Sequence, residues 1–172
     1  MEIEKGVDGG ADALRAELNT HRKEHGIVIG IFDGDGDGID KGFNKLNQTF
    51  AKKDGCGISV DRKAGAFYLP TPPGKENLAK LKLLWIENYF SVTALNLKTD
   101  EGYGLTFNVK NNTHSGQVTE KNTITDNELE LVSIKEGKQV FAEKIVPNLA
   151  AEEFEGFGLI FEKIKFIIEQ LQ

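Results

Sequence analysis

The fold is decided by residues 27–38, which read Ile27-Val28-Ile29-Gly30-Ile31-Phe32-Asp33-Gly34-Asp35-Gly36-Asp37-Gly38. The first half is a short, nearly continuous apolar run rich in β-branched residues, typical of a strand buried on both faces of a parallel sheet. The second half alternates aspartate with glycine. Ligands of α/β proteins lie at the carboxyl ends of the strands. The sequence therefore predicts a site in the loop that begins at Asp33.

Helical patterns flank this strand and its loop. Residues 11–25 place Leu14 and Leu18 four apart and end in basic residues, which suit the C-terminus of a helix. Residues 41–53 resume helical spacing, with apolar side chains on one face at Phe43, Leu46 and Phe50. A strand, an acidic loop and a helix in this order predict one half of a doubly wound α/β unit.

The rest of the chain adds strands and helices to this unit. Two further strands are predicted at residues 57–60 and 66–69, and Pro70 ends the second one. Residues 75–90 are amphipathic and predicted to be mostly helical. Residues 97–126 are rich in Lys, Asn, Thr and Gly, which predicts an irregular insertion with a hairpin around residues 104–109. Two helices are expected near residues 137–146 and 151–171.

Length and composition favour one globular domain without a membrane segment. The chain has 172 residues, of which 39% are hydrophobic and 28% charged. Its longest apolar runs are too short to span a bilayer, and its acidic N-terminus is unlike a signal peptide. A single cysteine excludes an internal disulfide and favours a cytoplasmic location. The net charge of −6 argues against a broad cationic surface for duplex DNA, although bound metal ions make an acidic site attractive to phosphate.

The acidic loop has three interpretations. Asp33, Asp35 and Asp37 repel one another unless a cation or amide donors neutralise them. Mg²⁺ or Mn²⁺ suits such oxygen ligands, with water and substrate phosphate completing the coordination. A calcium EF-hand loop fits less well, because the loop follows a strand and Asn44 stands where that motif has its bidentate glutamate. A solvated turn with no ligand is the third interpretation.

The same residues resemble the Asp-x-Asp segment of Toprim (topoisomerase–primase) domains, in which a hydrophobic strand runs into the pattern DxDxxG. Asp33, Asp35 and Gly38 match this pattern. Three other segments resemble, in chain order, parts of the Toprim nuclease domain of OLD-family (overcoming lysogenization defect) endonucleases. They are Val7–Asp12 before the first helix, the LPTPPG segment with Trp85–Phe90, and Gly137–Glu143.

The resemblance implies a Mg²⁺-dependent endonuclease that acts on phosphodiester bonds of DNA. On this likeness Asp33 and Asp35 hold a metal ion, and Asp37 is predicted as a further ligand. Glu87 contributes to a second ion or to its surroundings, and Lys138 offsets charge on the phosphate. The implied fold is a Rossmann-like, mostly parallel sheet flanked by helices, with a C-terminal helical extension. Residues 1–172 form one Toprim-like domain, with a sheet core over about 1–96, the insertion at 97–126 and a helical part at 127–172.

One element of the Toprim pattern is missing from the sequence. Toprim domains carry a glutamate on their first strand, and here the segment that resembles the second strand starts almost at Met1. Glu2 and Glu4 are poor substitutes. Either the chain is a piece of a larger protein, with an ATPase domain or partner chain supplying the rest, or it is a catalytically silent interaction module. Assembly into an oligomer stays open.

Overall fold

The structure, a computed structural model, describes residues 10–24, 26–110 and 117–172. It is a mixed α/β protein whose chain divides into two compact units. The first unit comprises Met1–Ile86 with Phe157–Gln172, and the second comprises Glu87–Gly156. None of the helices in the described ranges is both long and apolar enough to cross a membrane.

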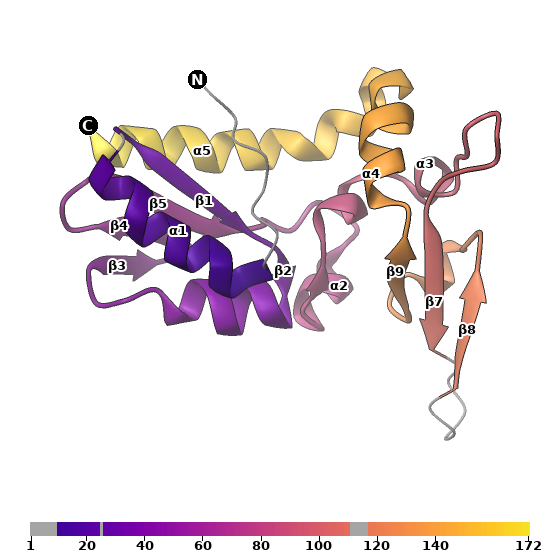
Figure 1. Ribbon diagram of the computed structural model, residues 1–172, viewed down its shortest axis with the longest axis horizontal. Helices are drawn as coiled ribbons and strands as arrows, with labels where there is room; N and C mark the ends of the chain where they lie inside the picture. Colours follow the sequence, from indigo (N-terminus) through magenta and orange to yellow (C-terminus); the bar gives the residue numbers. More distant parts are fainter. Residues whose placement is uncertain (1–9, 25, 111–116) are drawn as a thin grey trace. The chain divides into compact units, whose positions relative to one another are not determined.

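The first unit is built on a four-stranded sheet with the order β1-β5-β4-β3 (Figure 1). The strands are β1 (Val28–Phe32), β3 (Phe50–Lys53), β4 (Cys56–Ser59) and β5 (Ala64–Tyr68). β1 pairs with β5 in parallel, whereas β5 with β4 and β4 with β3 pair antiparallel. The α/β class is thereby confirmed, and so is a strand at Val28–Phe32. Its predicted burial on both faces is wrong, because Ile27 and Ile31 are exposed and β1 stands at the end of the sheet order. A mostly parallel sheet is not shown, because this sheet is mixed.

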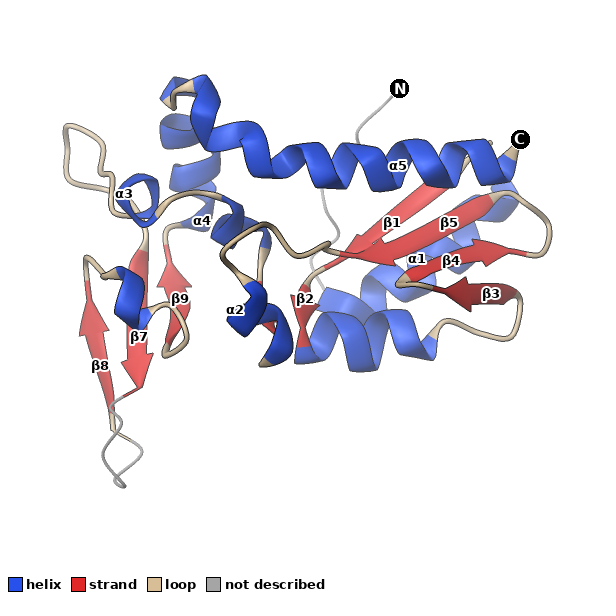
Figure 2. Cartoon of the chain, turned by 180° about the vertical axis from the view of Figure 1, so that it is seen from behind, coloured by secondary structure: helices blue, strands red, loops and turns tan. Residues whose placement is uncertain are grey.

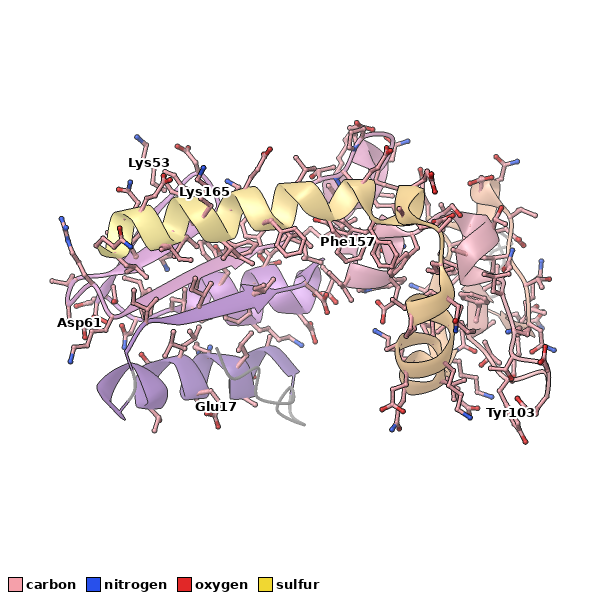
Figure 3. The ribbon with its side chains drawn as sticks, turned by 90° about the horizontal axis from the view of Figure 1, so that it is seen from above. Glu17, Lys53, Asp61, Tyr103, Phe157 and Lys165 are labelled. Atoms are coloured by element: carbon pink, nitrogen blue, oxygen red, sulfur yellow. The ribbon has the colours of Figure 1, made fainter. Side chains whose placement is uncertain are left out.

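Two helices sandwich this sheet, α1 (Gly10–Glu24) on one face and α5 (Gly158–Leu171) on the other (Figures 2 and 3). Glycines in β1 and β5 let the helices approach closely. A Cβ atom on Gly30 would lie 2.5 Å from Leu18 of α1, and a Cβ atom on Gly65 would lie 2.1 Å from Ile167 of α5. The main core cluster forms under α1 and contains Leu18, Phe32, Phe43, Leu46, Phe50, Ala64 and Ala66. The helix predicted at residues 11–25 is confirmed as far as Glu24, where its described part ends.

Short elements follow the carboxyl end of β1. The two-residue strand β2 (Gly34–Asp35) pairs antiparallel with β6 (Leu83–Leu84). A π-helix, Asp37–Gly42, and a 3-10 turn, Phe43–Lys45, follow β2, and the short helix α2 (Glu76–Lys80) precedes β6. These elements bracket the acidic loop.

The second unit has a three-stranded antiparallel sheet with the order β8-β7-β9. Its strands are β7 (Thr106–Lys110), β8 (Val118–Lys121) and β9 (Val132–Glu136). The helices are α3 (Val92–Leu95) and α4 (Lys138–Val140), with a π-helix Phe141–Ile145 and 3-10 turns at Ile86–Tyr89, Asp126–Glu128, Val146–Asn148 and Ala151–Phe157. Phe90 packs edge-on against two other rings of this unit. Its ring centroid lies 5.4 Å from that of Phe141 and 5.7 Å from that of Phe154.

Three predicted segments differ from the structure. The helix expected at residues 41–53 is wrong beyond Lys45, because Asp54 and Gly55 both adopt positive φ and turn Phe50–Lys53 back as a hairpin strand. The helix expected at 75–90 is wrong beyond Lys80, where the chain breaks to pair with β2. Residues 97–126 are not simply irregular, since they carry β7 and β8, whose pairing extends the expected hairpin. The helices expected near 137–146 and 151–171 are confirmed. Glu2, Glu4 and residues 7–9 of the Val7–Asp12 segment lie outside the described residues.

Candidate functional site

The acidic loop lies directly after β1, where the sequence predicts the site. Asp33 follows the last residue of β1, and the backbone then forms β2 against β6. The Gly36 amide donates to the carbonyl oxygen of Lys82 at 3.1 Å, which extends this pairing. The Asp33 and Asp35 side chains are both half-buried. Since they are two residues apart along nearly extended backbone, they project toward the same side of the chain.

Close backbone packing requires a glycine at position 38. A Cβ atom there would lie 2.2 Å from the carbonyl oxygen of Asp33, whereas one on Gly34 would make a tight but less severe contact, 3.0 Å from Cβ of Leu84. Gly36, by contrast, faces open space. The tight approach of Gly38 to Asp33 therefore folds the loop back on the end of β1.

The Asp35 carboxylate already has a structural role. Its Oδ1 atom accepts a hydrogen bond from the Gly38 amide at 2.6 Å. This bond satisfies one of the free N–H groups in the first turn of the following helix. The second carboxylate oxygen is left for another ligand, so capping and cation binding are compatible at this residue.

The next two acids are neutralised by lysines. Asp37 pairs with Lys41 at 2.8 Å, and Asp40 accepts hydrogen bonds from Lys82 Nζ at 2.8 and 2.6 Å. The bond from Lys82 lowers the pKa of Asp40 below its ordinary value. The bond to Asp37 raises the pKa of Lys41, and the charges of Asp12 and Asp35 add to this effect. The predicted metal ligand Asp37 thus pairs with Lys41, and cation binding by Asp33 and Asp35 stays a prediction.

The other two predicted site residues belong to the second unit and contact each other. Glu87 Oε1 pairs with Lys138 Nζ at 2.8 Å. Glu87 is 7% exposed, and its Oε2 atom has no hydrogen-bond partner among the described residues. That Glu87 and Lys138 take part in catalysis together with Asp33 and Asp35 stays a prediction.

The donor set of the loop suits some cations better than others. Across residues 10–24, 26–110 and 117–172, no group of three or more His, Cys, Asp or Glu residues is placed to hold a metal ion. Zn²⁺ and Ca²⁺ sites use at least three protein ligands. Mg²⁺ commonly takes one or two carboxylates and fills the remaining positions with water and phosphate oxygens. Asp33 and Asp35 fit the second pattern.

Sequence reasoning missed the two lysines that hold the outer acids. Lys41 stands four residues after Asp37, the spacing of an ion pair on one helix face, but the predicted helix began only at residue 41. The role of Lys82 could not have been predicted, because Lys82 reaches Asp40 through the pairing of β2 with β6 and through its own positive φ of 54°.

Comparison with known proteins adds no relative. No family model, curated protein or solved structure matches the chain.

Proposed function

We propose that the chain binds Mg²⁺ or Mn²⁺ through Asp33 and Asp35 and acts on phosphodiester bonds of DNA, as a Toprim-like nuclease domain does. The observation that supports this proposal is a pair of half-buried carboxylates two residues apart in the loop that follows β1. Two carboxylates without a third protein ligand in the described residues leave coordination positions for water and phosphate.

The roles of the residues follow from their contacts. Asp33 and the free Oδ2 of Asp35 would hold the cation, while Oδ1 of Asp35 stays on the Gly38 amide. When bound, the cation supplies Lewis acidity toward a phosphate oxygen and lowers the pKa of a water molecule. Lys41 and Lys82 reduce the negative charge that would repel an approaching phosphate. In the second unit, the unpartnered Oε2 of Glu87 is the oxygen best suited to assist a cation.

Metal binding is tested with Mn²⁺ titrations followed by electron paramagnetic resonance. Asp35→Asn retains an oxygen for the Gly38 amide but removes the charge, so it separates cation binding from capping. We expect Asp33→Asn and Asp35→Asn each to weaken Mn²⁺ binding at least about tenfold, the equivalent of about 1.4 kcal/mol. Asp40→Asn is the matched control, because Lys82 already occupies that carboxylate. Equal weakening in all three variants would show nonspecific attraction to the acidic loop and contradict the proposal.

Cleavage is tested separately, with supercoiled plasmid DNA and Mg²⁺ or Mn²⁺. We expect nicking by the chain, alone or with the protein segment that supplies the missing glutamate, and its loss in Asp33→Asn and Asp35→Asn. Lys138→Met should lower the rate if Lys138 offsets charge on the phosphate.

A catalytically silent interaction module is the second candidate function. Intact Mn²⁺ binding without nicking under any supplied metal, together with association with an ATPase domain that survives Asp33→Asn, would support this candidate over the nuclease.

A further inference from the structure

A second candidate site lies in the first unit, in an open hollow between the β3–β4 hairpin and α5. Its volume is about 660 Å³, within the usual range of roughly 300–1,000 Å³ for small-molecule sites. The hollow lies alongside the strands opposite β1 in the sheet order, whereas the acidic loop follows β1. The lining residues take no part in the site proposed above.

The hollow is basic, although the chain as a whole is acidic. Three cationic side chains line it, Lys53, Arg62 and Lys163, against one carboxylate, Asp54, in a chain of net charge −6. Figure 3 shows Lys53 extending from the first unit beside α5. Charge alone therefore favours an anionic ligand at this place.

Two of the three cations keep their hydrogen-bond donors available. Within the described part of the chain, the side chains of Lys53 and Arg62 make no ion pair or hydrogen bond that would occupy them. Lys163 Nζ donates to the carbonyl oxygen of Asp54 at 3.4 Å and to the Cys56 sulfur at 3.6 Å, and neither partner is a carboxylate. By contrast, Lys41, Lys82 and Lys138 are each paired with a carboxylate.

The Ser59 hydroxyl on the wall of the hollow is already used. Ser59 is buried, its hydroxyl donates to Asp61 at 2.5 Å, and the same oxygen accepts from the amides of Lys63 and Ala64. Recognition of a ligand's charge is therefore left to the cations. Apolar contact comes from Ile58, Val60 and Phe166, and the ring of Phe166 is 46% exposed.

Arg62 is held by an unusual backbone conformation. Its φ is 52°, in the left-handed region that favours glycine, and Asp54 on the same wall has a φ of 49°. Both residues stand in tight turns between antiparallel strands, Asp54 between β3 and β4 and Arg62 between β4 and β5. The turn thus holds a guanidinium at the rim of the hollow, where glycine would fit the backbone more easily.

We propose that this hollow binds a mononucleotide. The phosphate would contact Arg62 and Lys163, since a guanidinium matches phosphate oxygens in a bidentate manner and an ammonium adds a point charge. The planar base would pack on Phe166 and the aliphatic wall, and the amide of Gln170 offers a donor and an acceptor to the base edge.

The test is isothermal titration calorimetry of the whole chain with AMP, adenosine, inorganic phosphate and laurate, all in EDTA. Because metal is excluded, the result does not depend on Asp33 and Asp35. We expect AMP to bind at least about tenfold more tightly than adenosine or inorganic phosphate. Arg62→Gly and Lys163→Gln should each weaken AMP binding about tenfold.

The variants are chosen so that loss of folding does not imitate loss of binding. Glycine suits the positive φ at position 62, so Arg62→Gly should leave the melting temperature unchanged. Lys63→Gln is the matched control, because Lys63 is the exposed neighbour of Arg62 but does not line the hollow. The proposal is overturned if adenosine or phosphate alone binds as tightly as AMP, if laurate binds and AMP does not, or if Lys63→Gln weakens AMP binding as much as Arg62→Gly.

Discussion

Replacement of Gly38 and Gly36 by alanine, one at a time, measures how tightly the acidic loop is folded. Both glycines have backbone angles that alanine can adopt, so each substitution brings a similar entropic stabilisation of about 0.4–1 kcal/mol. Only Gly38 meets an obstacle, because its new Cβ atom would lie 2.2 Å from the carbonyl oxygen of Asp33 and 2.9 Å from that residue's N and C atoms. Gly36 has no heavy atom within 4 Å of its new Cβ.

The magnitude follows from the kind of atom that must move. Overpacking costs about 1–3 kcal/mol, and a backbone obstacle belongs at the upper end because it cannot rotate away. We expect Gly38→Ala to lose a net amount of about 2 kcal/mol in the free energy of unfolding and about 4–8 °C in melting temperature. Gly36→Ala should gain about 0.5 kcal/mol.

Urea unfolding followed by tryptophan fluorescence is a suitable assay. Trp85 is the only tryptophan of the chain and lies in the first unit, next to β6, so its signal reports on the unit that contains the loop. Mn²⁺ affinity should fall in Gly38→Ala alone, because the displaced backbone is that of Asp33. If the two alanine variants differ in stability by less than about 0.5 kcal/mol, the close approach of Gly38 to Asp33 is refuted.

Three further substitutions test contacts elsewhere in the two units. Ser59→Ala should cost about 1–3 kcal/mol in urea unfolding, because the buried hydroxyl accepts from two backbone amides that would lose this partner. Lys138→Met should destabilise the second unit by roughly 1–2 kcal/mol in thermal unfolding, because it leaves the buried Glu87 carboxylate without its partner. The loss is smaller than for a wholly buried pair, since the Lys138 side chain is half-exposed. The double variant with Glu87→Gln should recover part of the lost stability. Lys82→Met should raise the carboxyl pKa of Asp40 in a carbon-13 NMR titration, since the bond from Lys82 lowers it. The pair Asp40–Lys82 therefore stabilises the fold above the ordinary carboxyl pKa of about 3.9, and this stability is lost as pH falls through the lower pKa of the folded state. An unchanged pKa of Asp40 in Lys82→Met would contradict the pairing.

Local patterns predicted the parts of the fold that depend on neighbouring residues. The apolar run before Asp33 gave the strand, and the spacing of Leu14 and Leu18 gave the first helix. Phe43, Leu46 and Phe50 were expected to share an apolar face, and all three are buried in the core cluster. Their segment was nevertheless assigned wholly to a helix, because the turn at Asp54–Gly55 that reverses the last residues was overlooked.

The candidate site was predictable only up to its position on the chain. The loop lies at the end of a strand, as expected, and Asp33 and Asp35 are half-buried there. The engagement of Asp40 depends on Lys82, which lies far along the sequence and comes near only through sheet pairing. In the same way, the ion pair of Glu87 with Lys138 joins distant residues whose separate patterns gave no sign of each other.

The order of elements along the chain also affects how the protein is made. The face of β4 and β5 around Gly65 is covered by α5, and a ribosome reaches α5 only after it has synthesised the whole of Glu87–Gly156. During that interval the face of β4 and β5 stays exposed, because α5 has not yet been synthesised. We expect the second unit to fold first, while chaperones protect the earlier strands until Ile167 emerges.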